Sequence, residues 1–279
     1  MKATVLADNI ASGTLDGEWG LSIYIEYGET NILLDTGASD LFLRNAEKLG
    51  KSIPAVDYAV LSHAHYDHAD GMQTFFANNE KASFYLRSGS GETCYDKRWI
   101  FRNYIGLPKG ILNDYKTRIV FAQGDTALCP GVWLIPHKTA GLAQIGRKNH
   151  MYVRTAQGWK ADDFSHEQSL VFETAQGLVI FNSCSHGGAA TIVQEIRNTW
   201  PDQEILALVG GFHLFTQRNE EIRQLAAKLR DTGVREIYTG HCTGKRACRI
   251  LQEELGDLVH PFHTGLVMEW PAEDRRQYL

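Results

Sequence analysis

The stretch His63-Ala64-His65-Tyr66-Asp67-His68 concentrates three histidines and one aspartate in six residues, directly after an apolar run. Side chains two positions apart in an extended loop point the same way, so His63 and His65 can hold one cation through their imidazole nitrogens. Asp67 and His68 lie where the chain turns into a helix, and they point to a second position beside the first. A histidine-rich surface loop is the competing explanation, but the buried strand expected before it argues against that. The segment therefore predicts a metal centre for one or two ions.

Three further histidines lie in glycine-rich loops, each after an apolar strand. They are His186 in 182–188, His213 in 210–214 and His241 in 238–244. Glycine is expected where the backbone approaches a site closely. For each histidine alone, a purely structural role is a fair competitor, yet three in the same context favour ligands. Cys184 lies in the first of these loops, and its thiolate would favour zinc or iron over magnesium.

The composition is that of a globular chain, with 279 residues, 43% apolar and 22% charged. We expect a single domain over 1–279, with a lid-like insertion at about 87–118. The net charge of -5 has both signs interspersed, and without a long basic run it does not suggest nucleic acid. No stretch approaches the roughly 20 apolar residues of a membrane span, so no membrane partner is expected either. A homodimer is left open by the sequence.

The cysteines and the first residues bear on the compartment. The five cysteines are odd in number and contain no CxxC pair, which predicts free thiols in a reducing cytoplasm. The chain also becomes polar too soon after Met1 for a secretory signal.

Apolar periodicity predicts strands and helices in both halves of the chain. In the first half it predicts strands at 21–27, 32–34 and 56–61 and helices at about 39–49 and 69–78. In the second half it predicts a hairpin over 169–182, strands at 204–209 and 236–238, and helices around 192–196, 222–229 and 247–255. Two halves of this kind predict two packed sheets flanked by helices.

The segment 87–118 mixes glycine, proline, aromatic and basic residues, and it is either a long packed loop or a small helical insertion. Long loops within compact domains are often lids or binding elements. Basic side chains interleaved with tyrosine and tryptophan suit an anionic, partly aromatic substrate, although a solvated basic face is the alternative. Arg87, Arg98 and Arg102, together with His213, are the candidate substrate-binding residues.

Several of these motifs resemble the metallo-β-lactamase superfamily. Leu34-Asp35-Thr36-Gly37 is similar to its first motif, 63–68 matches its second, and Tyr238-Thr239-Gly240-His241 resembles its last histidine motif. The resemblance implies an α/β chain folded as a four-layer αββα sandwich, with the metal site at one edge of the sheets. It also implies that Asp35 orients the metal loop without binding metal, and that His241 binds the second ion.

The second half departs from the superfamily pattern at one point. Cys184 takes the place of the aspartate that usually bridges both metals, and His186 follows it. The usual third-motif histidine has no clear counterpart, because His166 is slightly out of register and Glu167 is an equal candidate to point inward. His186 is therefore a candidate replacement ligand.

These departures resemble one branch, the family related to 7,8-dihydropterin-6-methyl-4-(ribofuranosyl)aminobenzene 5'-phosphate synthase. The segments that carry this resemblance are 104–108, 183–186, 210–214 and 240–244, and the similarity runs from about Asn9 to Glu269. That branch's named activity belongs to folate-like cofactor synthesis.

Together these observations give one hypothesis for the site. The first ion is assigned to His63, His65 and His186, and the second to Asp67, His68 and His241, with Cys184 bridging them or lying beside them. Zinc is expected, as one or two ions, with iron or manganese as alternatives. Asp67 and His213 are the candidate catalytic residues: Asp67 would orient the nucleophile, and His213 would contact substrate or donate a proton.

The predicted function is a metal-dependent hydrolase that uses a metal-bound hydroxide on a small anionic, phosphorylated substrate. The first alternative is a dihydropterin condensation of the methanopterin type, with the metals as Lewis acids. A redox di-iron protein is disfavoured because the chain has no flavodoxin-like domain. A catalytically silent metal-binding or sensor module is the last alternative.

Overall fold

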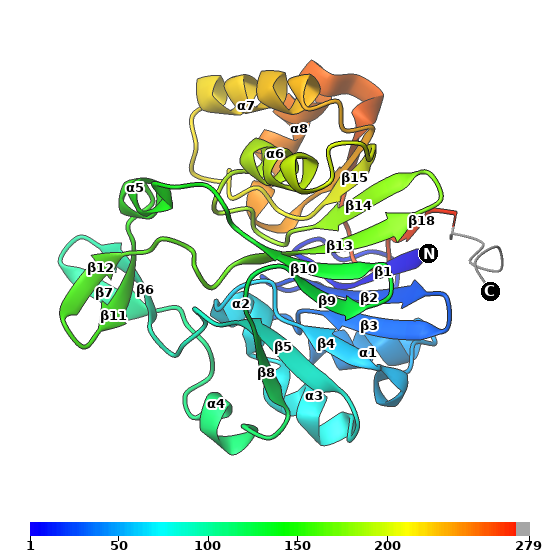
Figure 1. The fold of residues 1–279 in the computed structure, drawn as a ribbon, viewed down its shortest axis with the longest axis vertical. Helices are drawn as coiled ribbons and strands as arrows, with labels where there is room; N and C mark the ends of the chain where they lie inside the picture. The colour runs from blue at the N-terminus through cyan, green and yellow to red at the C-terminus, as the bar shows by residue number, and fades with distance from the viewer. Residues whose placement is uncertain (272–279) are drawn as a thin grey trace.

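Two seven-stranded sheets lie face to face at the centre of the molecule (Figure 1). The structure is a computed structural model that describes residues 1–271. The first sheet has the order β18-β1-β2-β3-β4-β5-β8. Its strands are β1 (Lys2–Ala7), β2 (Ser22–Tyr27), β3 (Thr30–Leu34), β4 (Tyr58–Val60), β5 (Ser83–Arg87), β8 (Ile119–Ala122) and β18 (Val267–Glu269).

The second sheet has the order β17-β16-β15-β14-β13-β10-β9. Its strands are β9 (Thr126–Cys129), β10 (Val132–Pro136), β13 (Gln168–Thr174), β14 (Gly177–Phe181), β15 (Ile205–Val209), β16 (Glu236–Thr239) and β17 (Val259–Pro261). The expected hairpin is present, with β13 and β14 antiparallel and Leu170 opposite Phe181.

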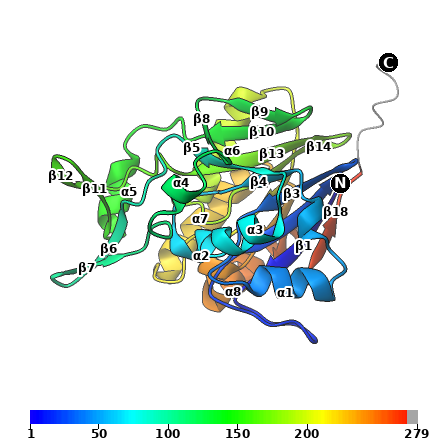
Figure 2. The same ribbon diagram turned by 90° about the horizontal axis from the view of Figure 1, so that it is seen from below.

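Helices cover the outer face of each sheet (Figures 1 and 2). On the first sheet's side lie α1 (Leu41–Lys48), α2 (Tyr66–Ala69), α3 (Met72–Asn78) and α4 (Ile111–Asp114), and on the second sheet's side lie α6 (Ala189–Thr199), α7 (Asn219–Asp231) and α8 (Lys245–Leu255). Three short 3-10 helices also occur, η1 (Ile53–Ala55), η2 (His241–Thr243) and η3 (Gly256–Leu258). No helix within 1–271 is long and apolar enough to cross a membrane.

Successive side chains along a strand point to opposite faces of its sheet, and this explains the layered architecture. In β2, Ile23 and Ile25 point into the core between the sheets, where they meet Phe172 and Phe181 of the second sheet. Tyr24, between them, packs instead into the core beneath α1 and α3. Strands with two buried faces need helices outside them, so the four-layer αββα sandwich is confirmed.

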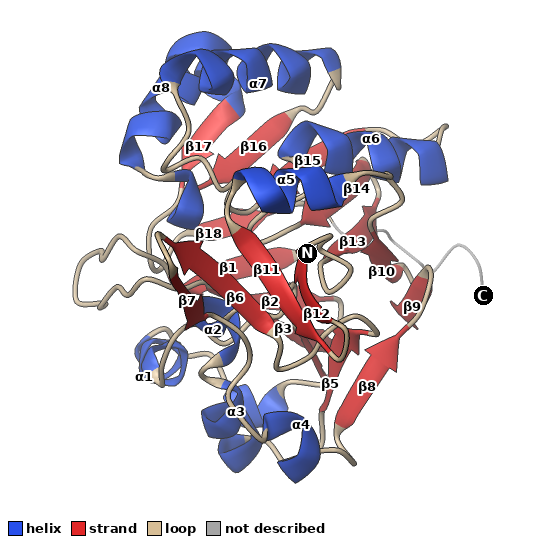
Figure 3. Cartoon of the chain, turned by 90° about the vertical axis from the view of Figure 1, so that its left-hand side faces the viewer, coloured by secondary structure: helices blue, strands red, loops and turns tan. Residues whose placement is uncertain are grey.

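A small third sheet projects from one side of the sandwich (Figures 1 and 2), and Figure 3 shows it in front of the two large sheets. It has the order β12-β11-β6-β7, with strands β6 (Cys94–Arg98), β7 (Phe101–Tyr104), β11 (Met151–Thr155) and β12 (Gly158–Ala161), and α5 (Leu142–Lys148) precedes β11. The prediction of a packed loop or helical insertion over 87–118 was therefore wrong in its main feature. A hairpin dominates this segment because β6 pairs with β11, far along the chain, and local periodicity does not show that pairing.

Parallel strands explain where the predicted site residues gather. In the first sheet β3 and β4 are parallel, and in the second sheet β14, β15 and β16 are parallel. The carboxyl ends of parallel strands meet at one edge of a sheet, where open α/β sheets bind their ligands. The motifs that follow these strands, around Asp35, His63, Cys184, His213 and His241, therefore lie at one edge.

Candidate metal centre

Asp35 fixes the orientation of two histidines in the 63–68 loop. Its carboxylate is fully buried and accepts hydrogen bonds from the Ser62 backbone N–H (2.7 Å), the Ser62 hydroxyl (2.7 Å) and His68 Nδ1 (2.7 Å). Because an ionised carboxylate only accepts, His68 carries its proton on Nδ1 and leaves the Nε2 lone pair free. The Ser62 hydroxyl, having donated its proton, accepts from His63 Nδ1 (2.8 Å), so the His63 Nε2 lone pair is free as well. One carboxylate thus prepares two ligand atoms.

The first group of candidate ligands is His63, His65 and His186. Their ligand atoms lie within 4.8 Å of one another. Nε2 of His63, Nε2 of His65 and both ring nitrogens of His186 are buried without a hydrogen-bond partner among residues 1–271. Burial lowers the pKa of His63 and His186 well below the ordinary value and that of His65 to about 3, so all three rings are neutral, which is the form that binds metals. Unpartnered buried nitrogens are costly, and a shared cation would satisfy them.

The second group is Asp67, His68 and His241. Their distances are 3.2 Å between His68 Nε2 and His241 Nε2, 3.4 Å between His241 Nε2 and Asp67 Oδ2, and 4.0 Å between His68 Nε2 and Asp67 Oδ2. Cys184 Sγ lies 3.2 Å from His68 Nε2. Tetrahedral zinc with bonds of roughly 2.0–2.3 Å separates its ligand atoms by roughly 3.3–3.8 Å, so this group is close to the size of a zinc site.

The tautomer of His241 strengthens this interpretation. Asn9 Nδ2 donates to the His241 carbonyl (3.0 Å), which turns Asn9 Oδ1 towards His241 Nδ1 (3.1 Å). His241 therefore donates from Nδ1, and its Nε2 lone pair faces that of His68. Two lone pairs at 3.2 Å repel unless a positive charge lies between them.

The charges around this position favour a cation. Burial opposes a charge on His241, yet the neighbouring Cys242, Asp67 and Asp8 raise its pKa to about 9. Burial also opposes ionisation of Asp67, but His68 and His241 lower its pKa below the usual range. The chain alone thus draws a proton to this position, and a divalent cation could take the proton's place.

Backbone strain is concentrated at the same place. Asp35 (φ 59°), Ser185 (φ 47°), His213 (φ 49°) and His241 (φ 46°) are non-glycine residues in the left-handed region, and all four adjoin the two ligand groups. Such conformations cost energy and persist where surrounding contacts enforce them, often at functional sites.

His166 and Glu167 support the centre from behind. His166 Nδ1 accepts the Ala64 backbone N–H (3.1 Å), and its Nε2 donates to Asp162 (3.0 Å). Glu167 accepts the His186 backbone N–H (3.0 Å) and binds His137 Nε2 (2.8 Å). His166 therefore has no free lone pair, although its ligand atom lies within 4.8 Å of that of His65.

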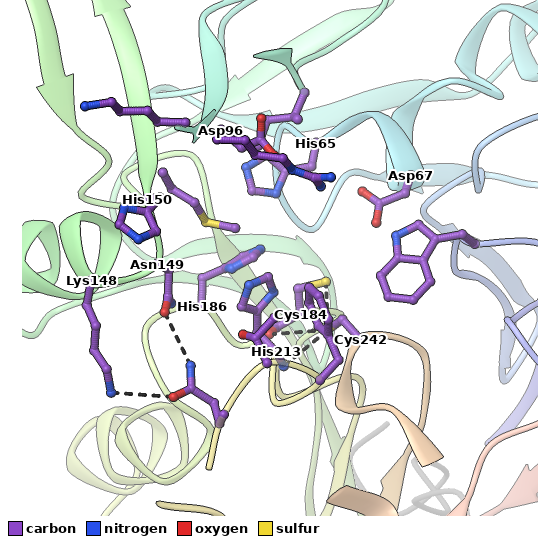
Figure 4. A pocket seen from close by; sticks show the side chains of 18 of the residues that line it. His65, Asp67, Asp96, Lys148, Asn149, His150, Cys184, His186, His213 and Cys242 are labelled. Carbon is purple, nitrogen blue, oxygen red and sulfur yellow. Dashed lines mark hydrogen bonds and ion pairs between the residues drawn. The ribbon is translucent and has the colours of Figure 1, made fainter. Parts of the chain in front are cut away.

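A cavity of about 950 Å³ opens over both ligand groups (Figure 4). Residues of both groups and their neighbours form its floor: His65, Asp67, Cys184, His186, His213 and Cys242. Trp19, Tyr66 and Phe215 also line the cavity, and the rings of Trp19 and Phe215 are in edge-to-face contact, with centroids 5.5 Å apart. Polar and charged residues of the third sheet, the end of α5 and the region of α7 line the rest, including Asp96, Lys97, Arg98, Lys148, Asn149, Arg218 and Glu221. The His213 ring lies 4.5 Å from that of His186, between centroids.

The structure separates the three arginines predicted to contact substrate. Arg98 lines the cavity, where its Nε lies 2.8 Å from Asp96. Arg87 is buried at the end of β5 and donates to the Gly124 carbonyl (2.9 Å), so it is not brought to the cavity. Arg102 stacks over the Trp159 ring at 4.5 Å, outside the lining. A cluster of basic residues in sequence does not determine where each side chain points.

Sequence reasoning missed several lining residues. Lys148 and Arg218 come from elements far from the metal loop, and Lys148 is paired with Glu221 at 2.8 Å. Trp19 precedes β2 and packs against His241 with ring centroids 5.3 Å apart. Only the fold brings these segments together, although the sequence shows an aromatic residue shortly before the strand predicted at 21–27.

Comparisons with known proteins agree with this geometry. The family model described as the metallo-beta-lactamase superfamily matches residues 18–146. The crystal structure of Tm1679, a metal-dependent hydrolase of the beta-lactamase superfamily, superposes with a TM-score of 0.83 at 29% identity, covering 97% of this chain and 99% of that one. The structure of Zn²⁺-bound PqqB from Methylobacterium extorquens has a TM-score of 0.57 at 12% identity, covering 97% of this chain and 100% of that one, and shares the fold alone.

A curated relative comes from Methanocaldococcus jannaschii. It is 7,8-dihydropterin-6-methyl-4-(beta-D-ribofuranosyl)-aminobenzene-5'-phosphate synthase, which is 26% identical over 264 residues and covers 90% of each chain. The matched family model, the structural neighbour and the fold agree in making this chain similar to the metallo-β-lactamase superfamily.

Proposed function

We propose that this chain is a metal-dependent hydrolase that holds one or two zinc ions and acts on a small anionic, phosphorylated substrate. The proposal depends on the two ligand groups. In the first, buried ring nitrogens of His63, His65 and His186 lie close together without hydrogen-bond partners among the described residues. In the second, the Nε2 atoms of His68 and His241 face each other at 3.2 Å. The match to the superfamily's family model and the similarity to a metal-dependent hydrolase support it.

The donor atoms suit zinc. His63, His65 and His186 would hold one ion through nitrogen, and Asp67, His68 and His241 would hold the other, with Cys184 beside both. Imidazole, carboxylate and thiol together suit zinc, with iron or manganese as alternatives, better than magnesium. Zinc bound there would supply Lewis acidity and lower the pKa of a water from about 15.7 to about 7.

The chain's own residues would then position the reactants. Asp67 stays ionised and can accept a hydrogen bond from the attacking water. His213, on the cavity floor beside His186, can contact the substrate or donate a proton to the leaving group. Lys97 is half-buried in the lining and can bind an anionic group. Trp19 and Phe215, whose rings meet edge to face with centroids 5.5 Å apart, offer apolar surface.

Metal content and turnover test the proposal together. We expect up to two zinc ions per chain and hydrolysis of members of a phosphomonoester, phosphodiester and lactone panel, both abolished by a strong chelator. His63→Ala should lower zinc content, whereas His260→Ala, whose ring stacks on Tyr238 away from the centre, should not. Equal zinc content in the two variants would refute the ligand assignment. Zinc binding without turnover on any substrate would instead favour a silent metal-binding or sensor module.

A second candidate is the dihydropterin condensation. The 26% identity to the synthase across 90% of both chains favours it, and the aromatic residues Trp19, Tyr66 and Phe215 in the cavity lining suit a pterin ring. The test is incubation with a pterin alcohol diphosphate and an aminobenzene riboside phosphate, with diphosphate release and a coupled product as the readout. Hydrolysis of the diphosphate without a coupled product would favour the hydrolase. A reducing cytoplasm is part of either proposal, and all five cysteines have free thiols.

A further inference from the structure

Two thiols from separate loops meet on the floor of the cavity. Cys184 follows β14 and Cys242 follows β16, and both line the cavity (Figure 4). Their sulfur atoms are 3.2 Å apart and form no disulfide. This is closer than the roughly 3.5–4.0 Å at which non-bonded heavy atoms usually rest. A small molecule that enters the cavity can therefore reach a pair of thiols already in contact.

The surrounding backbone keeps the two sulfurs together. The His213 backbone N–H donates to Cys242 Sγ (3.2 Å). Gly211 approaches so closely that a Cβ at that position would lie 2.5 Å from Cys242 Sγ, which closes that side. On the other side, Cys184 Sγ lies 3.2 Å from His68 Nε2, one of the candidate ligand atoms.

We propose that Cys184 and Cys242 form a peroxide-sensitive thiol pair, and that their oxidation to a disulfide removes Cys184 from the cation position of Asp67, His68 and His241. The disulfide rests on the contact between the sulfurs alone. Its effect on cation binding rests on the proposed function.

The reaction balances with hydrogen peroxide as the oxidant. One sulfur attacks a peroxide oxygen, the O–O bond breaks, and the released hydroxide takes up the thiol proton to give water and a sulfenic acid. The second sulfur attacks the sulfenic sulfur, the S–O bond breaks, and the leaving hydroxide takes the second thiol proton as another water. The two thiols together lose two electrons, which reduce the peroxide to two waters. Forming an S–S bond of about 2.05 Å from 3.2 Å requires an approach of about 1.1 Å.

Oxidation and cation binding then oppose each other. In the disulfide, Cys184 is no longer a thiolate and its sulfur is drawn towards Cys242, away from His68. Conversely, a cation that holds the Cys184 thiolate withdraws it from reaction with peroxide. By linkage, the disulfide should weaken cation binding by the same factor by which the cation disfavours the disulfide.

Thiol counting tests the disulfide. The full chain, stripped with a chelator or loaded with zinc, is treated with equimolar hydrogen peroxide, and free thiols are counted and peptides mapped. For the stripped protein we expect a fall from five to three thiols, with a 184–242 linked peptide that a dithiol reductant removes. Zinc at about 10 times its Kd leaves roughly one tenth of the protein metal-free and should slow the reaction about 10-fold.

Matched variants identify the pair. Cys248→Ser removes a buried thiol that bonds the Thr239 carbonyl (3.4 Å) and should still form the link. Cys242→Ser and Cys242→Ala should not form it. Oxidation of stripped wild-type protein to sulfinic acids without a 184–242 link, or linkage between other cysteines, would overturn the proposal.

Cobalt titration tests the coupling, because thiolate and imidazole ligands give Co²⁺ visible and near-ultraviolet bands. We expect peroxide to weaken Co²⁺ binding of wild-type protein about 10- to 100-fold, reversed by reduction, and to leave the Cys242 variants unchanged. If the disulfide forms and Co²⁺ affinity stays the same, the coupling is refuted. If reduced wild-type protein binds no Co²⁺ while the disulfide forms, the proposed function fails and the thiol pair stands.

Discussion

Replacing Asp35 with asparagine changes one carboxylate oxygen to an amide and should disrupt the ligand geometry without touching a ligand. In the native chain Oδ1 accepts from the Ser62 backbone, and Oδ2 accepts from the Ser62 hydroxyl and from His68 Nδ1, all at 2.7 Å. The asparagine oxygen can keep the backbone bond, but its NH₂ group then faces two donors. Two hydrogen bonds to a charged group are lost, at about 1.5–3 kcal/mol each, which sets a ceiling of about 3–6 kcal/mol on the loss of stability.

A change in the His68 tautomer would reduce this loss of stability, but it would also remove one of the metal-binding lone pairs. If His68 moves its proton to Nε2, Nδ1 can accept from the asparagine amide, but the lone pair that faces His241 disappears. We therefore expect zinc affinity to fall about 10- to 100-fold, or about 1.4–2.8 kcal/mol, in Asp35→Asn.

Two assays separate these effects. Zinc affinity is measured by competition with a chromogenic chelator, and the stability of stripped protein by denaturant unfolding. The control is Asp57→Asn, whose carboxylate also accepts a backbone N–H (Asn31, 2.9 Å) and a cation (Lys81, 2.6 Å) but lies outside the centre. Asp35→Asn protein that is less stable yet binds zinc within about threefold of wild type would refute the tautomer argument.

Three further expectations follow from named contacts. Glu167 and Glu195 hold a proton on buried His137 and raise its pKa to about 10 against the opposing effect of burial, so its stabilisation is complete below about pH 6.5 and is lost as pH rises through about 10. The free energy of unfolding of metal-free protein, measured as a function of pH, should show this decline, and the decline should be smaller in Glu195→Gln. Asn9→Ala removes the acceptor that keeps the proton of His241 on Nδ1. It should lower the affinity for a second Co²⁺ about 10-fold and leave the affinity for the first unchanged, as a two-step titration would show. Lys97→Ala should raise KM for a phosphorylated substrate about 10-fold with little change for a neutral ester, and a matching rise for both substrates would contradict a role in anion binding.

The sequence predicted those parts of the fold whose signal is local. Alternation in 22–27 and the 3-4 spacing in 219–231 correspond to β2 and α7. The first strand, Lys2–Ala7, escaped prediction because five of its six residues are buried on both faces and show no alternation. The third sheet escaped prediction because its strands are short and partly exposed, and because the pairing of β6 with β11 joins residues 55 to 59 positions apart.

At the candidate site, too, local spacing was predictable and contacts between distant segments were not. Spacing within 63–68 was enough to predict two ligand groups, and the structure places those predicted residues together. The meeting of Cys184 with Cys242 was not predictable, because it depends on β14 and β16 lying on either side of β15 in one parallel sheet. Nor could composition show that Arg87 turns towards Gly124 while Lys97 faces the cavity.

The second ligand group draws on both halves of the sandwich, and this gives a bound cation a structural role as well as a chemical one. Asp67 and His68 follow the first sheet's strand β4, whereas His241 and Cys184 follow strands of the second sheet. In the unfolded chain more than a hundred residues separate Asp67 and His68 from Cys184 and His241, so a cation that needs all of them binds the native state preferentially. At a free zinc concentration 100 times its Kd, that preference would add about 2.7 kcal/mol to stability. Because the ion would join the two sheets at their shared edge, the stabilisation should oppose separation of the two halves, and loss of Cys184 to a disulfide would weaken that connection together with the chemistry.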